Sequence, residues 1–242
     1  PVPLGSPGMV ALIHPFKDMG KIRGGNPFPI IGNNNFCLLL RFGHSEGHLA
    51  CNAVRQDILQ QVIENTGVGG GIIVNEKIVT GAHGAGGEIG HAFVNPAETK
   101  ACNCGNKGCL EQYASATGIA RLAKEALESE TEDSVLRTVK NISAKSVFDA
   151  YKEGDVLAGK IVDKFAAYLG NALAVFACVS DPDVFVIGGG VSKAGQVLID
   201  AVEKYYKAHA FTASKETPIK LATLGNDAGI YGAAKLILSK DN

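Results

Sequence analysis

The sequence predicts an α/β fold. Its 242 residues are 46% apolar and 19% charged, a composition typical of a globular protein with a buried core. Apolar residues recur every four positions through residues 155–179, which predicts a long helix with a buried face. A fully apolar strand at 184–187 then enters three successive glycines, and another helix is expected near 194–208. A helix, an apolar strand, a glycine turn and a helix in this order are typical of α/β proteins.

The remaining elements follow from local patterns. Residues 1–65 carry few signals, with scattered Pro and Gly and only short apolar runs. From residue 66 onward, changes of hydrophobic period and turn residues mark helices and strands. In chain order we expect a helix at 53–63, a β-hairpin of 72–74 with 78–79, a helix at 111–128, a strand at 219–224 and a last helix at 228–238.

Charge and hydropathy exclude two classes of partner. The formal net charge is −1 and the basic residues form no run, so no nucleic-acid footprint is visible. The first twenty residues lack the basic start and apolar stretch of a signal peptide. The longest apolar stretch, 165–179, is too short to span a bilayer. We therefore expect a soluble, cytoplasmic protein without a membrane or nucleic-acid partner.

A cysteine cluster predicts a metal site. Cys102, Cys104 and Cys109 lie within eight residues, and His91 precedes them by eleven positions. Three thiolates and one imidazole complete a closed tetrahedral zinc site, which is structural because no position is left for water. The alternatives are three ordinary thiols or a Cys102–Cys109 disulfide, which a reducing cytosol disfavours. Spacing alone leaves open whether His91 is the fourth ligand or a surface histidine.

Two glutamates flank this cluster. Glu88 lies three residues before His91, and Glu111 lies two residues after Cys109, so a metal here would fix the segment that carries both. Rigidly placed carboxylates suit the binding of sugar hydroxyls, because flexible groups lose entropy on binding. The alternative is that both glutamates are solvated surface charges.

Two glycine-rich segments are candidates for nucleotide binding. Residues 66–71 read Thr-Gly-Val-Gly-Gly-Gly, and such a segment can present backbone N–H groups to phosphate oxygens. It is not a Walker loop, since no Gly-Lys-Ser/Thr follows. Gly188 to Gly190 end an apolar strand, where ligands of α/β folds bind. Either segment could instead be a plain turn.

Together these motifs resemble the ROK family of sugar kinases and sugar-responsive repressors. The resemblance covers residues 66–242 and is faint before them. It implies a two-domain, actin-like ATPase (ribonuclease H-like) fold with a structural zinc knuckle. Residues 1–64, together with a C-terminal helix at about 228–242, would be the remnant of a small N-terminal domain, and residues 65–227 the large domain. The family's N-terminal Asp-x-Gly-Gly-Thr phosphate loop has no counterpart here, so we expect the N-terminal domain to be incomplete.

The resemblance also implies an activity and roles for individual residues. It implies ATP-dependent phosphorylation of glucose at the 6-hydroxyl, with Mg²⁺ accompanying ATP and Zn²⁺ held by His91, Cys102, Cys104 and Cys109. Homodimers or homotetramers are expected. By match to family motifs, Glu88, His91 and Glu111 would bind the sugar, Thr66 and Gly67 would face the ATP phosphates, and Gly188, Gly189 and Gly190 would lie near the adenosine.

One position departs from the family pattern. The family's catalytic base is the Asp of an Asn-Asp-x-Asn motif, and the nearest counterpart here is Asn33-Asn34-Asn35. Asn33 and Asn34 would still contact the sugar, but an amide at position 34 cannot accept the hydroxyl proton as a carboxylate does. This departure makes a catalytically impaired sugar-binding protein one alternative. The others are a kinase for another hexose, such as fructose or N-acetylmannosamine, since discrimination between hexoses rests on a few hydroxyl contacts, and a sugar-sensing regulator of the same family.

Overall fold

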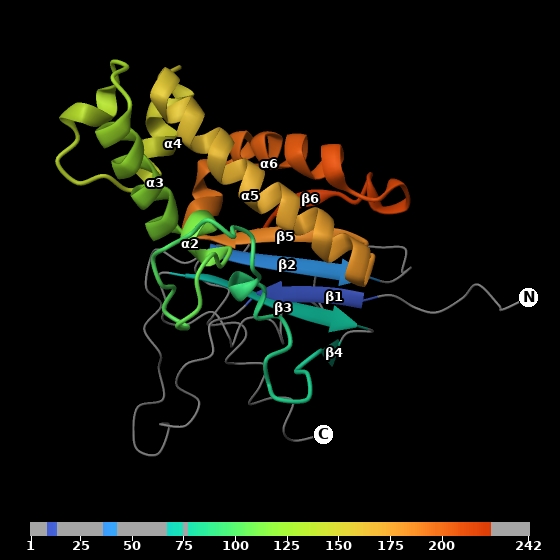
Figure 1. Cartoon of the computed structure of the whole chain (residues 1–242). Coiled ribbons are helices and arrows are strands. Elements are labelled where there is room, and N and C mark those ends of the chain that lie inside the picture. Colours follow the sequence, from blue (N-terminus) through green and yellow to red (C-terminus); the bar gives the residue numbers. More distant parts are fainter. Residues whose placement is uncertain (1–8, 14–35, 43–66, 75–76, 224–242) are drawn as a thin grey trace, which may run out of the picture.

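A six-stranded mixed sheet with helices packed on it forms the described part of the chain. The computed structural model describes residues 9–13, 36–42, 67–74 and 77–223. The strand order is β4-β3-β1-β2-β5-β6, and Figure 1 shows α5 and α6 lying along one face of the sheet. The strands are β1 (Met9–Ile13), β2 (Phe36–Phe42), β3 (Val68–Val74), β4 (Lys77–Ile78), β5 (Val184–Gly189) and β6 (Ile219–Leu221).

The sheet register confirms the predicted hairpin and the predicted apolar strand. β3 and β4 pair antiparallel with Ile73 opposite Ile78. β5 pairs antiparallel with β2 and parallel with β6, so it lies inside the sheet. Phe185 and Ile187 of β5 are fully buried, and the Phe185 ring meets the Tyr206 ring of α6 edge to face at 5.4 Å. An apolar strand is expected where a strand has neighbours on both sides and a helix on its face.

The sequence analysis missed one of the helices, at residues 144–152. They are α2 (Glu111–Ala114), α3 (Ala116–Ser129), α4 (Ala144–Lys152), α5 (Val156–Ser180) and α6 (Gln196–His209), with 3₁₀ turns η2 (Ile89–His91), η3 (Val135–Thr138), η4 (Gly190–Ala194) and η5 (Thr212–Ser214).

Helix α5 is the centre of the core. Asp155 caps its start by accepting the Ala158 N–H at 2.9 Å, and Asp181 ends it in the left-handed conformation at φ 45°. The predicted apolar stripe, from Leu157 through Phe165 to Leu173, is buried. At 25 residues the helix exceeds the apolar stretch used to judge membrane spanning, and by length and composition it could cross a bilayer. However, 56% of its apolar window is buried against the rest of the protein, which is the property of a core helix.

The predicted helix at 111–128 is interrupted at Ser115. Ser115 has an extended backbone (φ −77°, ψ 164°), which ends α2, and its hydroxyl accepts the Gly118 N–H and so caps α3. Serine competes with helical hydrogen bonding in this way, and it therefore favours caps over helix interiors. The interruption turns the chain between Glu111 and the long helix that follows.

The domain division stays a prediction. Strands β1 and β2 come from the segment 1–64 that was assigned to a small domain, and they pair with β3 and β5 in the same sheet. The helices expected at 53–63 and 228–238 lie outside the described residues.

Candidate functional site

The cysteine segment folds as a compact knuckle. A bridge joins Phe93 to Cys109, and another joins Ala101 to Lys107. Within the second, the Cys102 N–H donates to the Asn106 carbonyl at 2.6 Å. Gly105 and Gly108 adopt φ of 92° and 73°, a region that favours glycine, so the backbone turns sharply at both positions.

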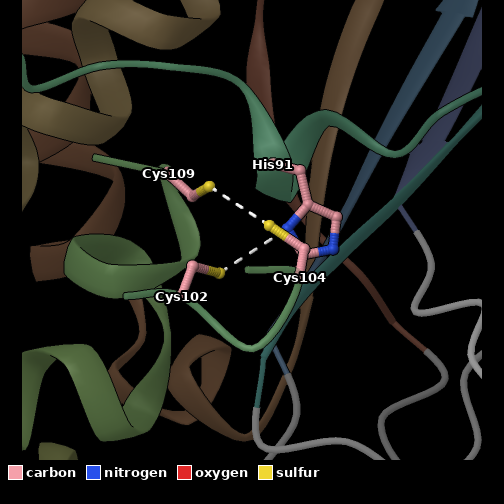
Figure 2. Close-up of side chains that lie close together, drawn as sticks. All are labelled: His91, Cys102, Cys104 and Cys109. Atoms are coloured by element: carbon pink, nitrogen blue, oxygen red, sulfur yellow. Dashed lines mark hydrogen bonds between the residues drawn. The ribbon is translucent and has the colours of Figure 1, made fainter. Parts of the chain in front are cut away.

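His91, Cys102, Cys104 and Cys109 converge on one point. Their ligand atoms all lie within 4.8 Å of one another, and Figure 2 shows the side chains directed inward from η2 and the knuckle. The Cys104 and Cys109 sulfurs are 3.6 Å apart, and His91 Nδ1 lies 3.7 Å from the Cys102 sulfur. A zinc tetrahedron with bonds of about 2.0–2.3 Å has edges of roughly 3.5–3.8 Å. The donor set and its spacing therefore fit a zinc ion.

The same geometry excludes the disulfide alternative. Cys102, Cys104 and Cys109 are free thiols, and 3.6 Å between two sulfurs is far beyond the roughly 2.05 Å of a disulfide. Burial raises the pKa of the Cys109 thiol, and its hydrogen bond to Cys104 raises it further. Burial also acts to raise the pKa of Cys104, but hydrogen bonds from the Asn106 backbone and the two neighbouring thiols outweigh it and lower that pKa. Metal binding would release these protons, so its affinity depends on pH.

Each of the two candidate carboxylates contacts one member of this cluster. Glu88 Oε2 is 3.7 Å from His91 Nε2, the ring nitrogen that points away from the sulfurs. Glu111 Oε1 lies 3.5 Å from the Cys102 sulfur. The carboxylate of Glu111 is buried, with 8% of the residue exposed, so it is not a solvated surface charge. The structure thus brings together the sugar-site residues predicted at 88, 91 and 111.

Gly67 contacts Glu111. The second carboxylate oxygen of Glu111 accepts the Val68 N–H at 3.2 Å. A Cβ atom at Gly67 would lie 1.9 Å from that oxygen, so only glycine leaves room for it. The first glycine of the 66–71 segment therefore meets a carboxylate of the knuckle, a contact that the sequence analysis did not anticipate. Thr66, Asn33 and Asn34 lie outside the described residues.

A half-buried ion-pair network supports the knuckle, and the sequence analysis missed it. The Glu98 carboxylate accepts the Tyr113 hydroxyl at 2.6 Å and the Arg121 guanidinium at 2.9 Å. Arg121 also donates to the Gln112 carbonyl and lies 5.0 Å from the centre of the Tyr113 ring. In turn, the side-chain carbonyl of Gln112 accepts the Cys109 N–H at 3.1 Å. The network therefore ties the loop before the knuckle to α2 and α3.

The second glycine segment borders a cavity. Gly188 and Gly189 end β5, and Gly190 begins η4 at the rim of a cavity of about 520 Å³. Apolar side chains of Ile142, Phe148 and Val191 line it together with the cations of Lys145, Lys152 and Lys193. A concave, mostly apolar site with a few polar groups is the usual form of a small-molecule pocket. Gly190, one of the three glycines that the sequence analysis expected near the adenosine, lines this cavity.

Comparison with known proteins places these features in a family context. A sequence model of the ROK family matches residues 44–240. The glucokinase of Halalkalibacterium halodurans is 43% identical over 181 residues, which cover 73% of this chain and 55% of that protein. An N-acetylmannosamine kinase of Yersinia pestis is 33% identical over 201 residues, which cover 82% of this chain and 63% of that protein.

A solved structure extends the likeness to the fold. The ROK family glucokinase from Streptomyces griseus, in complex with glucose and AMPPNP, is 34% identical and superposes with a TM-score of 0.64. The superposition covers 71% of this chain and 57% of that chain. The chain therefore has the fold of the ROK sugar kinases, and it spans about 55–63% of the length of these relatives.

Proposed function

The chain belongs to the ROK family, and from this membership we propose that it binds a hexose and transfers the γ-phosphoryl group of ATP to the sugar 6-hydroxyl. Glucose is the proposed substrate, because glucokinases are among the relatives. Fructose and N-acetylmannosamine are the competing sugars, and a relative at 33% identity carries the name of the latter kinase. A cytoplasmic location and a homodimer or homotetramer remain predictions.

One observation carries the proposal: the thiol and histidine cluster contacts both candidate carboxylates, Glu88 through His91 and Glu111 through Cys102. With Nδ1 directed at the sulfurs, His91 turns Nε2 toward Glu88 at 3.7 Å. A metal-bound imidazole is held in one tautomer with its other N–H oriented, so Nε2 would donate to a sugar oxygen. Glu88 and Glu111 would accept sugar hydroxyls. The zinc ion supplies rigidity here and takes no part in the chemistry, because all four ligand positions are filled.

The nucleotide is assigned to the second glycine segment. The cavity beside Gly190 has apolar walls for a base and lysines at its rim for polar or anionic groups. In the transfer, the bond from the γ-phosphorus to the leaving ADP oxygen breaks, a bond to the sugar oxygen forms, and the hydroxyl proton passes to solvent water. Positioning and the Mg²⁺ that accompanies ATP supply most of the catalysis of such a reaction. Asn34 stands at the position of the family's catalytic base, and its amide cannot accept the hydroxyl proton as a carboxylate does.

The test is an ADP-release assay with Mg-ATP and a panel of glucose, fructose and N-acetylmannosamine, paired with calorimetric sugar binding. Glucose-dependent ADP release is the expected result. Turnover with another sugar alone would move the assignment to that hexose. Sugar binding without ADP release from any sugar would favour a catalytically impaired sugar-binding protein and contradict the proposed kinase.

A further inference from the structure

The start of strand β3 contacts two segments that adjoin metal ligands. Glu111 of α2 accepts the Val68 N–H at 3.2 Å and occupies the space that a Cβ at Gly67 would fill. A Cβ at Gly90 would lie 1.9 Å from the Val68 carbonyl oxygen. Gly90 is the residue before His91, in the 3₁₀ turn η2. The peptide groups of Val68 are thus enclosed by η2 and α2.

Both of these contacts with Val68 come from segments that carry or adjoin the metal ligands. His91 belongs to η2, while Cys102 and Cys109 belong to the knuckle that leads into α2. Glu111 lies two residues after Cys109, so an ion that holds Cys109 also restrains the start of α2. An ion that joins His91 to the three sulfurs would fix the separation between η2 and α2. That separation determines whether Glu111 reaches the Val68 N–H while Gly90 packs against the Val68 carbonyl.

The enclosed segment includes Gly67, which the family resemblance assigns to the ATP phosphates. Val68 is 2% exposed, and a buried N–H that lost its acceptor would cost about 1–3 kcal/mol of stability. Release of Glu111 would therefore favour another backbone arrangement at Gly67 and Val68. A phosphate contact through backbone N–H groups depends on their direction, so it would weaken with this rearrangement.

We propose that Glu111 is a positioning residue that couples occupancy of the metal site to nucleotide binding, by holding Gly67 and Val68 in place. The nucleotide half of this inference rests on the proposed function. Zinc is then more than a support for the sugar pocket, because its presence also sets the geometry of the phosphate segment. By linkage, a nucleotide that gains affinity from zinc must strengthen zinc retention by the same factor.

The variant that tests the coupling is Glu111→Asp. It keeps the negative charge but withdraws the carboxylate by one methylene group, so it no longer bridges Val68 and Cys102. The matched control is Glu128→Asp, the same change at an exposed position of α3. Each protein is measured zinc-loaded and after chelation, without sugar, by calorimetric binding of AMPPNP with Mg²⁺ and by hydrogen exchange of the peptide that contains Val68.

In the wild type and the control, chelation is expected to weaken AMPPNP binding about tenfold and to speed exchange at Val68. In Glu111→Asp, exchange is expected to be fast even with zinc, and AMPPNP affinity is expected to be nearly independent of zinc. Unchanged Val68 exchange on chelation of the wild type would overturn the proposal, as would a wild-type zinc dependence in Glu111→Asp. Failure of the zinc-loaded wild type to bind AMPPNP, with zinc-dependent exchange intact, would instead refute the nucleotide assignment and leave the enclosure of Val68 standing.

Discussion

The network behind the knuckle makes a quantitative prediction for Glu98→Gln. Burial acts to raise the pKa of the Glu98 carboxyl, but hydrogen bonds from Tyr113 and the Lys100 amide and the charge of Arg121 outweigh it and lower the pKa from 4.5 to about 2. At about 1.4 kcal/mol per pKa unit, this depression corresponds to roughly 3 kcal/mol of folding free energy at neutral pH. The side chain of Glu98 is 7% exposed but that of Arg121 is 24% exposed, so solvent screening reduces the expected loss to about 2 kcal/mol.

The matched control is Glu125→Gln, because Glu125 contacts the same arginine. The Arg121–Glu125 pair is 3.1 Å long, close to the 2.9 Å of the Arg121–Glu98 pair, but the Glu125 side chain is 37% exposed. Exposed ion pairs contribute little, so Glu125→Gln should cost less than about 1 kcal/mol. The assay is urea denaturation of the three proteins at matched pH values.

The lowered pKa of Glu98 also predicts how the stability difference between the two proteins changes with pH. A carboxylate whose pKa is lowered by folding stabilises the protein above its unfolded pKa, and that contribution is lost as the pH falls through the folded value. The difference between wild type and Glu98→Gln should therefore be full at pH 7 and should shrink as the pH falls from about 4.5 toward 2. Equal losses for the two Gln variants at pH 7, or a gap that stays constant down to pH 3, would refute the reasoning.

Three further changes test the site. Metal analysis should find about one zinc per chain. Cys104→Ser should lower the melting temperature, while the control Cys178→Ser, at an exposed thiol of α5, should not. Equal melting temperatures of the two variants would contradict a structural metal. Glu88→Gln should weaken hexose binding at least about tenfold and leave AMPPNP binding nearly unchanged, so equal losses would contradict its assignment to the sugar. Gly90→Ala should cost about 1–3 kcal/mol in urea denaturation, because its methyl group would collide with the Val68 carbonyl, and a neutral change would show that η2 does not pack there.

A helix with a long, regular apolar pattern and a good N-cap residue was predictable from the sequence. Helix α5 was expected at 155–179 and spans Val156–Ser180, because its apolar stripe is long and Asp155 is a good cap. Helix α4 was missed: it is nine residues long, and its capping box pairs Ser143 with Ser146 in place of the usual Glu or Gln. The interruption at Ser115 was missed as well, since a helical hydrophobic pattern continues across it.

The Glu98 network could not be predicted from the sequence. A glutamate, a tyrosine and an arginine separated by 15 and 8 positions carry no local signal, and charged residues mostly lie at the surface. Burial of Glu98 follows from the packing of one loop against α2 and α3, which includes the stacking of Tyr113 on Tyr168 at 3.9 Å between ring centres. Such a pair is recognised only when the elements are placed in space. The cysteine spacing, in contrast, was informative by itself, because metal ligands close in sequence constrain a short loop directly.

The glycine-rich segment at 67–71 shows why recognising a motif does not assign a role to each of its residues. A glycine is selected whenever a Cβ would collide, and the sequence does not say with what. At Gly67 the colliding group is the carboxylate of Glu111, 44 residues further along the chain, and at Gly90 it is the carbonyl of Val68. Both glycines therefore serve contacts inside the protein, whether or not a phosphate also approaches the first. If Glu111 and the phosphate segment share Gly67 in this way, then the sugar site and the nucleotide site meet at a single peptide, and a substitution assigned to one of them must be measured in both.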